Sequence, residues 1–322
     1  MTIPSEQGSL RTFDVTLVGE FNLDLLLYGL PEELSVEREL LADRAEMVLG
    51  GSPAITAHNL AMLGDRVGFI SMAAKDAFAS QCMRELEAAS VDLSRAVNTE
   101  SGTGVTVLLQ HDHVRRMLTY PGNTTHLRFD DLDLEYLASS RHFHLSSYFL
   151  QTSLKDDVPR LFALLKEAGL TISVDTNDDP SGLWNHSIAE MLQYVDILLP
   201  NEQEACRLAH TEDLDEAIAW ILQYVPLVVI KRGAEGATAC TRARQYTASP
   251  IKMRTIIDAV GAGDSFNAGF LHGFLHGWPI DRSLHHGNLA GAYSTTAIGG
   301  VAAFQNRAAM QQFFAEHSLQ VK

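Results

Sequence analysis

The sequence is poor in cysteine and in positive charge, and it contains no long apolar run. Its three cysteines lie far apart and form no Cys-x-x-Cys pair, which indicates reduced thiols rather than a disulfide framework or a zinc site. The 24 Lys and Arg against 40 Asp and Glu give a net charge of −16, which argues against a general nucleic-acid or anionic-membrane binder. No run approaches the roughly 18 apolar residues of a membrane span, and the first ten residues are polar. We therefore expect a cytoplasmic protein with neither a nucleic-acid nor a membrane partner.

What the sequence does contain is an alternation of strand-like and helix-like segments. With 322 residues and 46% hydrophobic content, the chain can bury the core of one large α/β domain or two smaller ones. Short β-branched or apolar runs cover residues 14–18, 67–72, 142–146, 171–174, 196–199 and 227–230. Helical spacing of apolar residues covers 54–63, 79–89, 158–168, 188–194 and 214–224. This order predicts an α/β fold with a mostly parallel sheet, helices on both faces and a site at the carboxyl ends of the strands.

Two pairs of extended segments interrupt this alternation. Residues 23–30 are followed by 47–49, and residues 104–110 are joined to 114–120 through a plausible hairpin turn at 111–113. We expect them to form a small β-sheet lid, spanning about 23–49 and 103–121, within one domain of residues 1–322. Such a lid could close over a substrate and exclude water. The alternative is an edge extension of the central sheet.

The most informative segment is residues 258–267, with the sequence DAVGAGDSFN. The strand-like run 251–257 before it predicts a strand, and a helical pattern follows, so Gly261 and Gly263 would lie at a strand-to-helix turn. Small residues there leave backbone N–H groups open to an anion, which the helix dipole also attracts. Asp264 would lie in the first helical turn, stay ionised and accept a proton from an attacking hydroxyl. Alternatively, the glycines make an ordinary turn and Asp264 only complements the helix dipole.

Five motifs in register resemble those of the ribokinase family, also called the PfkB carbohydrate kinases. The opening motif is GEFNLD at 19–24, and GGSPAITAHNLAMLG at 50–64 is similar to the first family signature. The third is PNEQE at 200–204, the fourth is KRGAEG at 231–236, and residues 258–266 resemble the second signature. The resemblance spans nearly the whole chain. It implies a ribokinase-like fold and ATP-dependent phosphorylation of a sugar or sugar-like alcohol.

The resemblance also assigns roles to individual residues. Asp264 would be the base, and the backbone of Gly261, Ala262 and Gly263 would form the anion hole. The residues that would bind the sugar-like substrate are Asn22, Asp24, Gly50, Gly51 and, on the next helical turn after Ile55, Asn59. Without the flanking motif, Asp24 could be an exposed strand-end acid, and the glycine pair could be a simple turn before a helix capped by Ser52.

Further positions would bind the nucleotide and the metal ions. Asn201 and Glu204 could order water bound to Mg²⁺ beside the phosphates of ATP, although a helix cap with a surface acid is the alternative. The strand and turn that carry Lys231, Gly233 and Gly236 would face the nucleotide. A monovalent cation such as K⁺ would bind near the anion hole, at Asp258, Val260, Thr295, Ile298 and Gly300. The resemblance to the family also implies a homodimer formed through the lid.

The chain departs from the family pattern near the substrate. Ile55 replaces an asparagine that typically helps to hold the substrate, and an arginine expected in the stretch 175–184 is missing near Asp179 and Pro180. Arg115 and Arg116 on the lid could meet a carboxylate or phosphate instead, although such arginines are more often solvated. The sequence therefore leaves the substrate open among ketohexoses, ribose, deoxy-sugar acids and nucleosides.

Histidines offer a few other candidate positions. His272 and His276 share a helix face, but without an apparent third ligand we expect a packed or solvated pair. His142 and His144 alternate along a strand, so one of them could line the site.

Three other functions compete with a sugar kinase. A nucleoside kinase would have the same fold. A nicotinamide-dependent oxidoreductase would explain the Gly-x-Gly turn, but Phe266 occupies the position of the third small residue of its fingerprint. A non-catalytic sensor would bind a sugar or nucleotide without turnover, whereas the presence of Asp264 with both anion-hole glycines favours catalysis.

Overall fold

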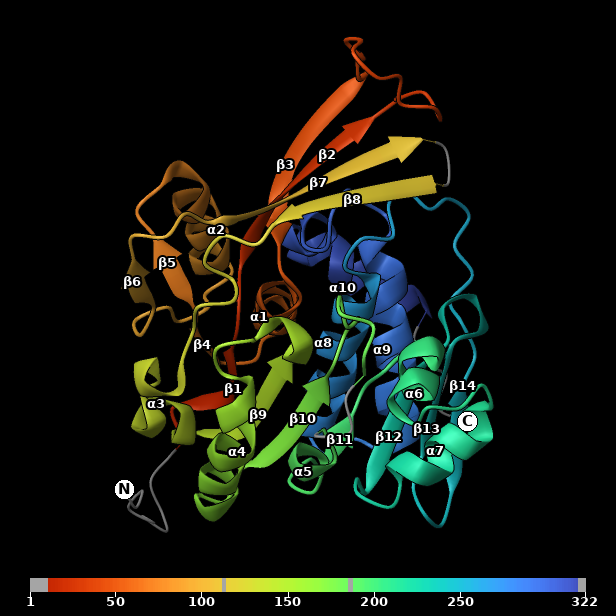
Figure 1. Cartoon of the computed structure of the whole chain (residues 1–322). Helices are drawn as coiled ribbons and strands as arrows, with labels where there is room; N and C mark the ends of the chain where they lie inside the picture. Colours follow the sequence, from red (N-terminus) through yellow and green to blue (C-terminus); the bar gives the residue numbers. More distant parts are fainter. Residues whose placement is uncertain (1–10, 112–113, 185–187, 318–322) are drawn as a thin grey trace.

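The computed structural model describes residues 11–111, 114–184 and 188–317, and its centre is an eight-stranded sheet (Figure 1). The strand order is β14-β13-β12-β11-β10-β9-β1-β4. Neighbours from β4 to β12 pair in parallel, and β13 and β14 are antiparallel. The strands are β1 (Phe13–Val18), β4 (Val67–Ile70), β9 (Ser140–Ser146), β10 (Thr171–Asp175), β11 (Ile197–Leu198), β12 (Leu227–Lys231), β13 (Ala237–Cys240) and β14 (Gln245–Ala248).

Helices cover both faces of this sheet, because the side chains of each buried strand alternate between two hydrophobic cores. In β12, for example, Val229 joins one core, and Val228 and Ile230 join the other. The first core contains residues of α1 (Ser52–Leu63), α2 (Ala77–Ala88), α8 (Ala262–Leu275), α9 (Ile280–Ser294) and α10 (Arg307–His317). The second contains residues of α3 (Leu134–Ala138), α4 (Val158–Glu167), α5 (Ile188–Leu192), α6 (Glu202–Leu208) and α7 (Leu214–Ile221). The predicted α/β fold is confirmed.

A separate four-stranded sheet projects from the body (Figure 1). Its order is β3-β2-β7-β8, and its strands are β2 (Asn22–Tyr28), β3 (Arg44–Gly50), β7 (Gly104–His111) and β8 (Val114–Tyr120). The small lid sheet is therefore present, and the alternative of an edge extension of the central sheet is wrong. The predicted turn at residues 112 and 113 lies outside the described residues. Two short strands, β5 (Met72–Ala74) and β6 (Val97–Thr99), form a third sheet.

One predicted strand is wrong. Residues 251–257 are a loop, and Ile256 and Ile257 are 63% and 50% exposed. The described sheet ends at β14, so this β-branched run has no neighbouring strand to pair with and its side chains face solvent. The glycine turn before α8 therefore follows a loop that crosses the surface. None of the helices in the described residues is long and apolar enough to cross a membrane.

Candidate active site

The amino terminus of α8 is only partly buried and lies beside Lys231. Gly261 is its N-cap with φ of 71°, and a Cβ placed there would lie 2.5 Å from the Cα of Gly300, so only glycine fits. A Cβ on Gly263 would lie 3.8 Å from Nζ of Lys231, which places this ammonium group beside the first turn. Backbone N–H groups, the helix dipole and a lysine thus converge where a phosphoryl group could bind.

Asp264 lies in this first turn and accepts a hydrogen bond from Oγ of Ser52, the first residue of α1. Burial raises the pKa of Asp264 to about 6, and Asp175 adds to the rise, whereas Ser52 and Lys231 oppose it. We expected a carboxylate that stays ionised, and a pKa near 6 still leaves most of it ionised at pH 7. The raised pKa makes Asp264 a better proton acceptor than an exposed aspartate.

A buried ion pair between Lys231 and Asp175 lies next to this turn. Asp175, at the carboxyl end of β10, is completely buried and accepts hydrogen bonds from Lys231 and from Nδ2 of Asn267, the latter at 2.5 Å. Burial alone would lower the pKa of Lys231, but Asp175 and Glu204 outweigh it, so the pKa is raised and the ammonium group persists. Asp175 and Asn267 were not predicted as site residues, although Asp175 begins the stretch 175–184 and Asn267 ends the segment 258–267.

Asn201 and Glu204 form a reciprocal cap of α6. Oδ1 of Asn201 accepts the N–H of Glu204, and Oε2 of Glu204 accepts the N–H of Asn201, both at 2.8 Å. The cap that the sequence suggested is therefore present, but Glu204 is buried rather than a surface acid. Burial raises its pKa to about 7, although Lys231 opposes the shift. Glu204 is thus an acid close to the anion-binding turn.

The two glycines that follow β12 differ in their surroundings. Gly236 lies against the end of β14, where a Cβ would come within 2.2 Å of the carbonyl of Ala248. This glycine is required by packing of the turn. Gly233 has φ of 52° and open space around its Cα.

The first residues of β2 belong to a polar cluster of buried side chains, Asn22, Asp24, Glu20 and Gln151. Nδ2 of Asn22 donates to Oδ1 of Asp24 at 2.6 Å, and both side chains are largely buried. A Cβ on Gly50 would lie 2.3 Å from Asp24, and one on Gly51 would lie 2.8 Å from the carbonyl of Glu20, so the glycine pair makes room for this cluster. Burial raises the pKa of Asp24 to about 7, and the charges of Asp264 and Asp258 raise it further. Asp24 is therefore not an exposed acid, and it interacts with Asp264.

Glu20, which was not predicted as a site residue, belongs to the same polar cluster. Its Oε2 accepts a hydrogen bond from Nε2 of Gln151 at 2.5 Å, and burial raises its pKa to about 8. The charge of Asp264 also raises this pKa. Oε1 of Gln151 is buried and has no hydrogen-bond partner among the described residues, so it could accept a hydrogen bond from a hydroxyl. Glu20 lies within the opening motif, but Gln151 is 131 residues away in the sequence.

The structure does not place Asn59 where it could bind a substrate. It is fully buried, and its Nδ2 donates to Oγ of Ser265 at 3.0 Å and to the carbonyl of Gly300 at 2.9 Å. Ile55, which replaces the asparagine of the family, packs against Gly261 and Gly300. Both side chains hold the α8 turn against the 299–300 segment, because α1 and α8 pack together.

The residues proposed for a monovalent cation are brought together next to this turn. Asp258 accepts the N–H groups of Val260 at 3.0 Å and of Gly299 at 2.9 Å. The carbonyl of Thr295 accepts the N–H of Ile257 at 2.8 Å. The carbonyl of Thr295 also accepts the N–H of Asp258 at 3.4 Å, and the carbonyl of Gly300 accepts Asn59 at 2.9 Å and Ser265 at 3.4 Å, so a bound cation would share these oxygens with protein donors.

The remaining polar candidates contact other parts of the protein. Asp179 accepts N–H groups of its own loop, from Ser181 at 2.9 Å and Trp184 at 2.8 Å. Arg116 donates to the carbonyl of Glu32 on the lid, and the side chain of Arg115 lies outside the described residues.

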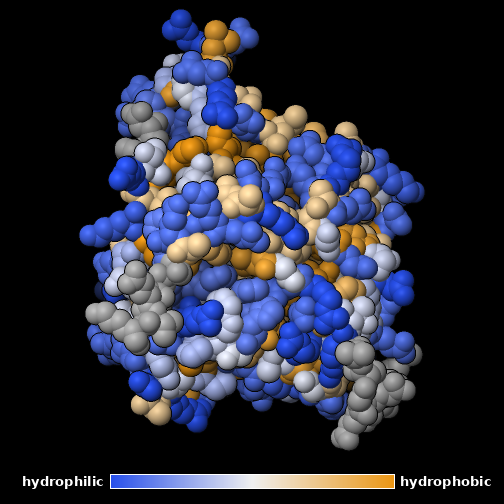
Figure 2. Space-filling view, turned by 180° about the vertical axis from the view of Figure 1, so that it is seen from behind, coloured by the Kyte–Doolittle hydropathy of each residue, from blue (hydrophilic) through white to orange (hydrophobic). Residues whose placement is uncertain are grey.

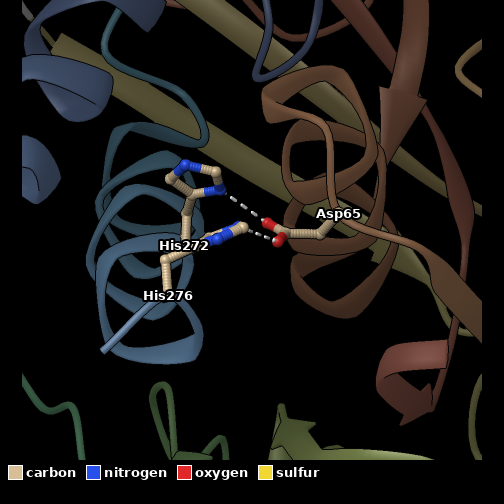
Figure 3. Close-up of side chains that lie close together, drawn as sticks. All are labelled: Asp65, His272 and His276. Atoms are coloured by element: carbon tan, nitrogen blue, oxygen red, sulfur yellow. Dashed lines mark hydrogen bonds and ion pairs between the residues drawn. The ribbon is translucent and has the colours of Figure 1, made fainter. Parts of the chain in front are cut away.

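Both strand histidines, His142 and His144, are fully buried. Each hydrogen-bonds to Oγ of Ser173 at 2.7 Å, so neither lines the site. His272 and His276 do have a third neighbour, Asp65, which the sequence analysis did not find (Figure 3).

The comparisons with known proteins agree with this geometry. The family described as pfkB family carbohydrate kinase matches residues 12–307. The chain is 25% identical over 286 residues to a 5-dehydro-2-deoxygluconokinase of Geobacillus kaustophilus, covering 84% of this chain and 85% of the relative. It is 28% identical over 280 residues to a 2-dehydro-3-deoxygluconokinase of Bacillus subtilis, covering 82% and 86%.

A solved structure has the same fold. It is titled as a ribokinase II from E. coli in complex with ATP and Mg²⁺, and it superposes with a TM-score of 0.81 at 24% identity, covering 95% of this chain and 100% of that one. The family match covers nearly the whole described chain and includes both Asp24 and Asp264. The chain therefore belongs to the pfkB family of carbohydrate kinases, which are phosphotransferases with an alcohol group as acceptor.

Proposed function

We propose that this protein transfers the γ-phosphoryl group of ATP to a hydroxyl of a sugar-like substrate, with Asp264 as the general base. The observation that carries the proposal is the position of Asp264, in the first turn of α8 and close enough to Asp24 for its charge to raise the pKa of Asp24. Asp264 would take the proton of the acceptor hydroxyl as that oxygen attacks phosphorus. Ser52 would hold the carboxylate in place through its hydrogen bond.

The anion hole would stabilise the transferring group. The N–H groups of Gly261, Ala262 and Gly263 would bind its oxygens at the amino terminus of α8, where that of Ala262 now donates to the carbonyl of Ala259 at 3.3 Å. Lys231 adds positive charge beside them. Because these groups are fixed before the reaction, they would stabilise developing negative charge at little reorganisation cost. The nucleotide would extend from this point over the turn that carries Gly233 and Gly236.

Mg²⁺ fits the acidic residues beside Lys231. The cap of α6 uses Oε2 of Glu204, so its second carboxylate oxygen could bind a water of the ion, as Mg²⁺ usually retains several waters. Asn201 would orient Glu204 through the reciprocal cap. Bound Mg²⁺ would neutralise charge on the phosphates. The E. coli structure that resembles this chain contains ATP and Mg²⁺, which supports this assignment.

The substrate would bind through hydroxyl groups. Asn22, Asp24, Glu20 and Gln151 offer closely spaced donors and acceptors, the pattern that suits vicinal hydroxyls. Gly50 and Gly51 would let the sugar approach the backbone. The names of the curated relatives add 5-dehydro-2-deoxygluconate and 2-dehydro-3-deoxygluconate to the candidate substrates.

Two further features are proposed with this function. A monovalent cation such as K⁺ would bind at carbonyls of the segments 258–260 and 295–300, which Asp258 links through its hydrogen bond from Gly299.

A second copy of the chain would cover the lid, because Met117, Leu118 and Tyr120 on β8 are 59–70% exposed. Hydrophobic surface is visible on this projecting part at the top of the molecule (Figure 2). A monomeric mass by sedimentation at micromolar concentration would contradict the dimer.

The test is an ADP-release assay with ATP and Mg²⁺ against a panel of acceptors. The panel should hold the two deoxy-sugar acids, ribose, fructose and a nucleoside, each in KCl and in NaCl. We expect turnover with one sugar or sugar acid, higher in KCl, and loss of that turnover in Asp264→Asn. ADP release with the nucleoside alone would favour a nucleoside kinase, and nucleotide binding without turnover on any acceptor would favour a sensor.

A further inference from the structure

A second cluster of ligand-type side chains lies at the opposite end of α8 from the anion-binding turn. Asp65 follows α1, and His272 and His276 come from the last turn of α8 and the residue after it (Figure 3). Nδ1 of His272 donates to Asp65 at 2.9 Å and Nε2 of His276 donates at 3.1 Å. Eight residues separate Asp264 from His272, which is about 12 Å along the helix axis. This triad is therefore distinct from the proposed active site.

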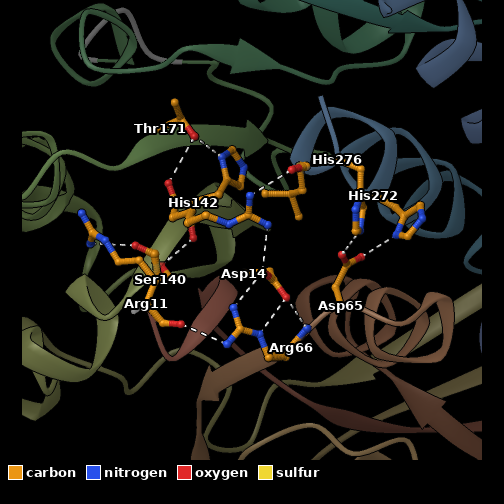
Figure 4. Close-up of polar contacts among 11 residues, drawn as sticks. Arg11, Asp14, Asp65, Arg66, Ser140, His142, Thr171, His272 and His276 are labelled. Atoms are coloured by element: carbon orange, nitrogen blue, oxygen red, sulfur yellow. Dashed lines mark hydrogen bonds and ion pairs between the residues drawn. The ribbon is translucent and has the colours of Figure 1, made fainter. Parts of the chain in front are cut away.

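The charge balance of the triad differs from that of the neighbouring acid. Asp14 is bound by the guanidinium groups of Arg66 at 3.1 Å and Arg141 at 2.8 Å, which offset its charge (Figure 4). The side chain of Asp65 is completely buried, and within the described part of the chain it accepts hydrogen bonds from the two imidazoles. An imidazole carries positive charge only when it is protonated, whereas the guanidinium groups at Asp14 are always charged. A buried carboxylate of this kind is best stabilised by a bound cation.

The geometry of the triad suits a transition-metal ion. Two histidines at i and i+4 on one helix face are a known zinc-binding arrangement, and a carboxylate is a common third ligand. The candidate ligand atoms all lie within 4.8 Å of one another, whereas tetrahedral zinc ligands are about 3.3 Å apart. Small side-chain rotations would close this difference. His276 is 45% exposed, which gives the ion access and leaves a position for water.

Two neighbouring rings hold His272 in place. His286 stacks on His272 at 5.3 Å, and its Nδ1 donates to the carbonyl of Gly269 at 2.9 Å. Trp278 packs edge-on against His272 on the same side. These rings restrict the orientation of His272, as the environment of a metal ligand usually does.

We propose that Asp65, His272 and His276 bind a divalent first-row transition ion such as Zn²⁺, which clamps the carboxyl-terminal ends of α1 and α8 together. The amino-terminal ends of the same two helices carry Ser52 and Asp264, which are also bonded to each other. The ion therefore fixes the helix pair that positions the proposed base. Two imidazole ligands select against the Mg²⁺ that accompanies ATP, because Mg²⁺ prefers oxygen.

The test is a Zn²⁺ titration of the chelator-treated full-length protein in excess Mg²⁺, followed by calorimetry, with Co²⁺ absorption as a second probe of tetrahedral coordination. We expect one equivalent of Zn²⁺ and a higher Tm in its presence. The double variant His272→Gln/His276→Gln should weaken binding by at least about 100-fold, since loss of an outer partner alone costs about 10–100-fold. His126→Gln, which removes an exposed histidine in the loop after β8, should bind like the wild type.

Two results would overturn the proposal: no Zn²⁺ binding at micromolar metal, or the same affinity and stoichiometry in the double variant as in the wild type. Circular dichroism without metal checks that the double variant is folded. If it is not, His276→Gln alone replaces it, because this half-exposed side chain contributes little packing. Metal binding is read out without kinase activity, so the result does not depend on the proposed phosphorylation.

Discussion

Asp264→Asn separates the catalytic role of Asp264 from its effect on stability. The substitution keeps the shape of the side chain, and the Ser52 hydroxyl can still donate to Oδ1. It removes the only function that amide chemistry cannot replace, which is accepting a proton. General-base catalysis typically contributes about 10²–10⁴-fold, so we expect kcat to fall by about that factor while the KM for ATP changes little.

The same substitution should stabilise the protein. Burial raises the pKa of Asp264 from 3.8 to about 6, and two pKa units correspond to about 3 kcal/mol of ionisation cost. The folded state binds this proton more tightly than the unfolded state, so this residue's contribution to stability is present below about pH 4. It is lost as the pH rises through about 6. Part of Asp264 remains exposed, and solvent screening reduces the cost, so we expect a gain of about 1–3 kcal/mol at pH 7.

Three measurements test this reasoning. The first is kcat by ADP release, the second is urea unfolding at pH 7 and at pH 4, and the third is the pH profile of wild-type kcat/KM. The profile should fall below about pH 6, and the stability gain of Asp264→Asn should shrink at pH 4. The exposed Asp130→Asn variant removes the same charge elsewhere, and it should change neither kcat nor the free energy of unfolding. Near wild-type kcat in Asp264→Asn would refute the role of the base, and lower stability at pH 7 would refute the ionisation cost.

Other substitutions test the surroundings of the site. Ser52→Ala removes a hydrogen bond that lowers the pKa of the catalytic carboxylate, so the acid limb of kcat/KM should move to higher pH; an unchanged limb would contradict this contribution. Gly261→Ala should cost more than the ~1–2 kcal/mol of a left-handed alanine, because its Cβ meets backbone at 2.5 Å, whereas Gly182→Ala has open space and should cost only that amount in urea unfolding. Lys231→Met should cost about 3–5 kcal/mol by leaving Asp175 buried without its counter-charge, and adding Asp175→Asn should recover part of this loss; full stability in the single variant would contradict the importance of the pair.

Features that depend on one stretch of chain could be predicted from the sequence. The alternation of apolar runs predicted the central sheet and its helices, because the spacing of apolar residues in a strand or helix repeats within a few residues. The lid strands and the position of Asp264 in the first turn of α8 follow from the same local patterns. The loop 251–257 shows the limit of this reasoning. Its residues have strand propensity, but a strand also needs a neighbour to pair with.

The partners of the polar side chains could not be predicted in this way, because the topology decides them. Asp175 and Lys231 are 56 residues apart, Glu20 and Gln151 are 131 apart, and Asp65 meets His272 across 207 residues. A sequence pattern does not indicate which residues so far apart in the chain will meet, because the strand order decides this.

The sequence by itself thus determined the family, the layers and the glycine turn that we propose as the phosphoryl site, because short-range periodicity and contiguous motifs specify them. The tertiary structure decided which acids are buried, which cations offset them and that Asn59 packs the core instead of facing a substrate. Burial and charge pairing depend on neighbours that the fold brings from distant parts of the chain, and these neighbours set the pKa of Asp264 and the ligands of the proposed metal clamp.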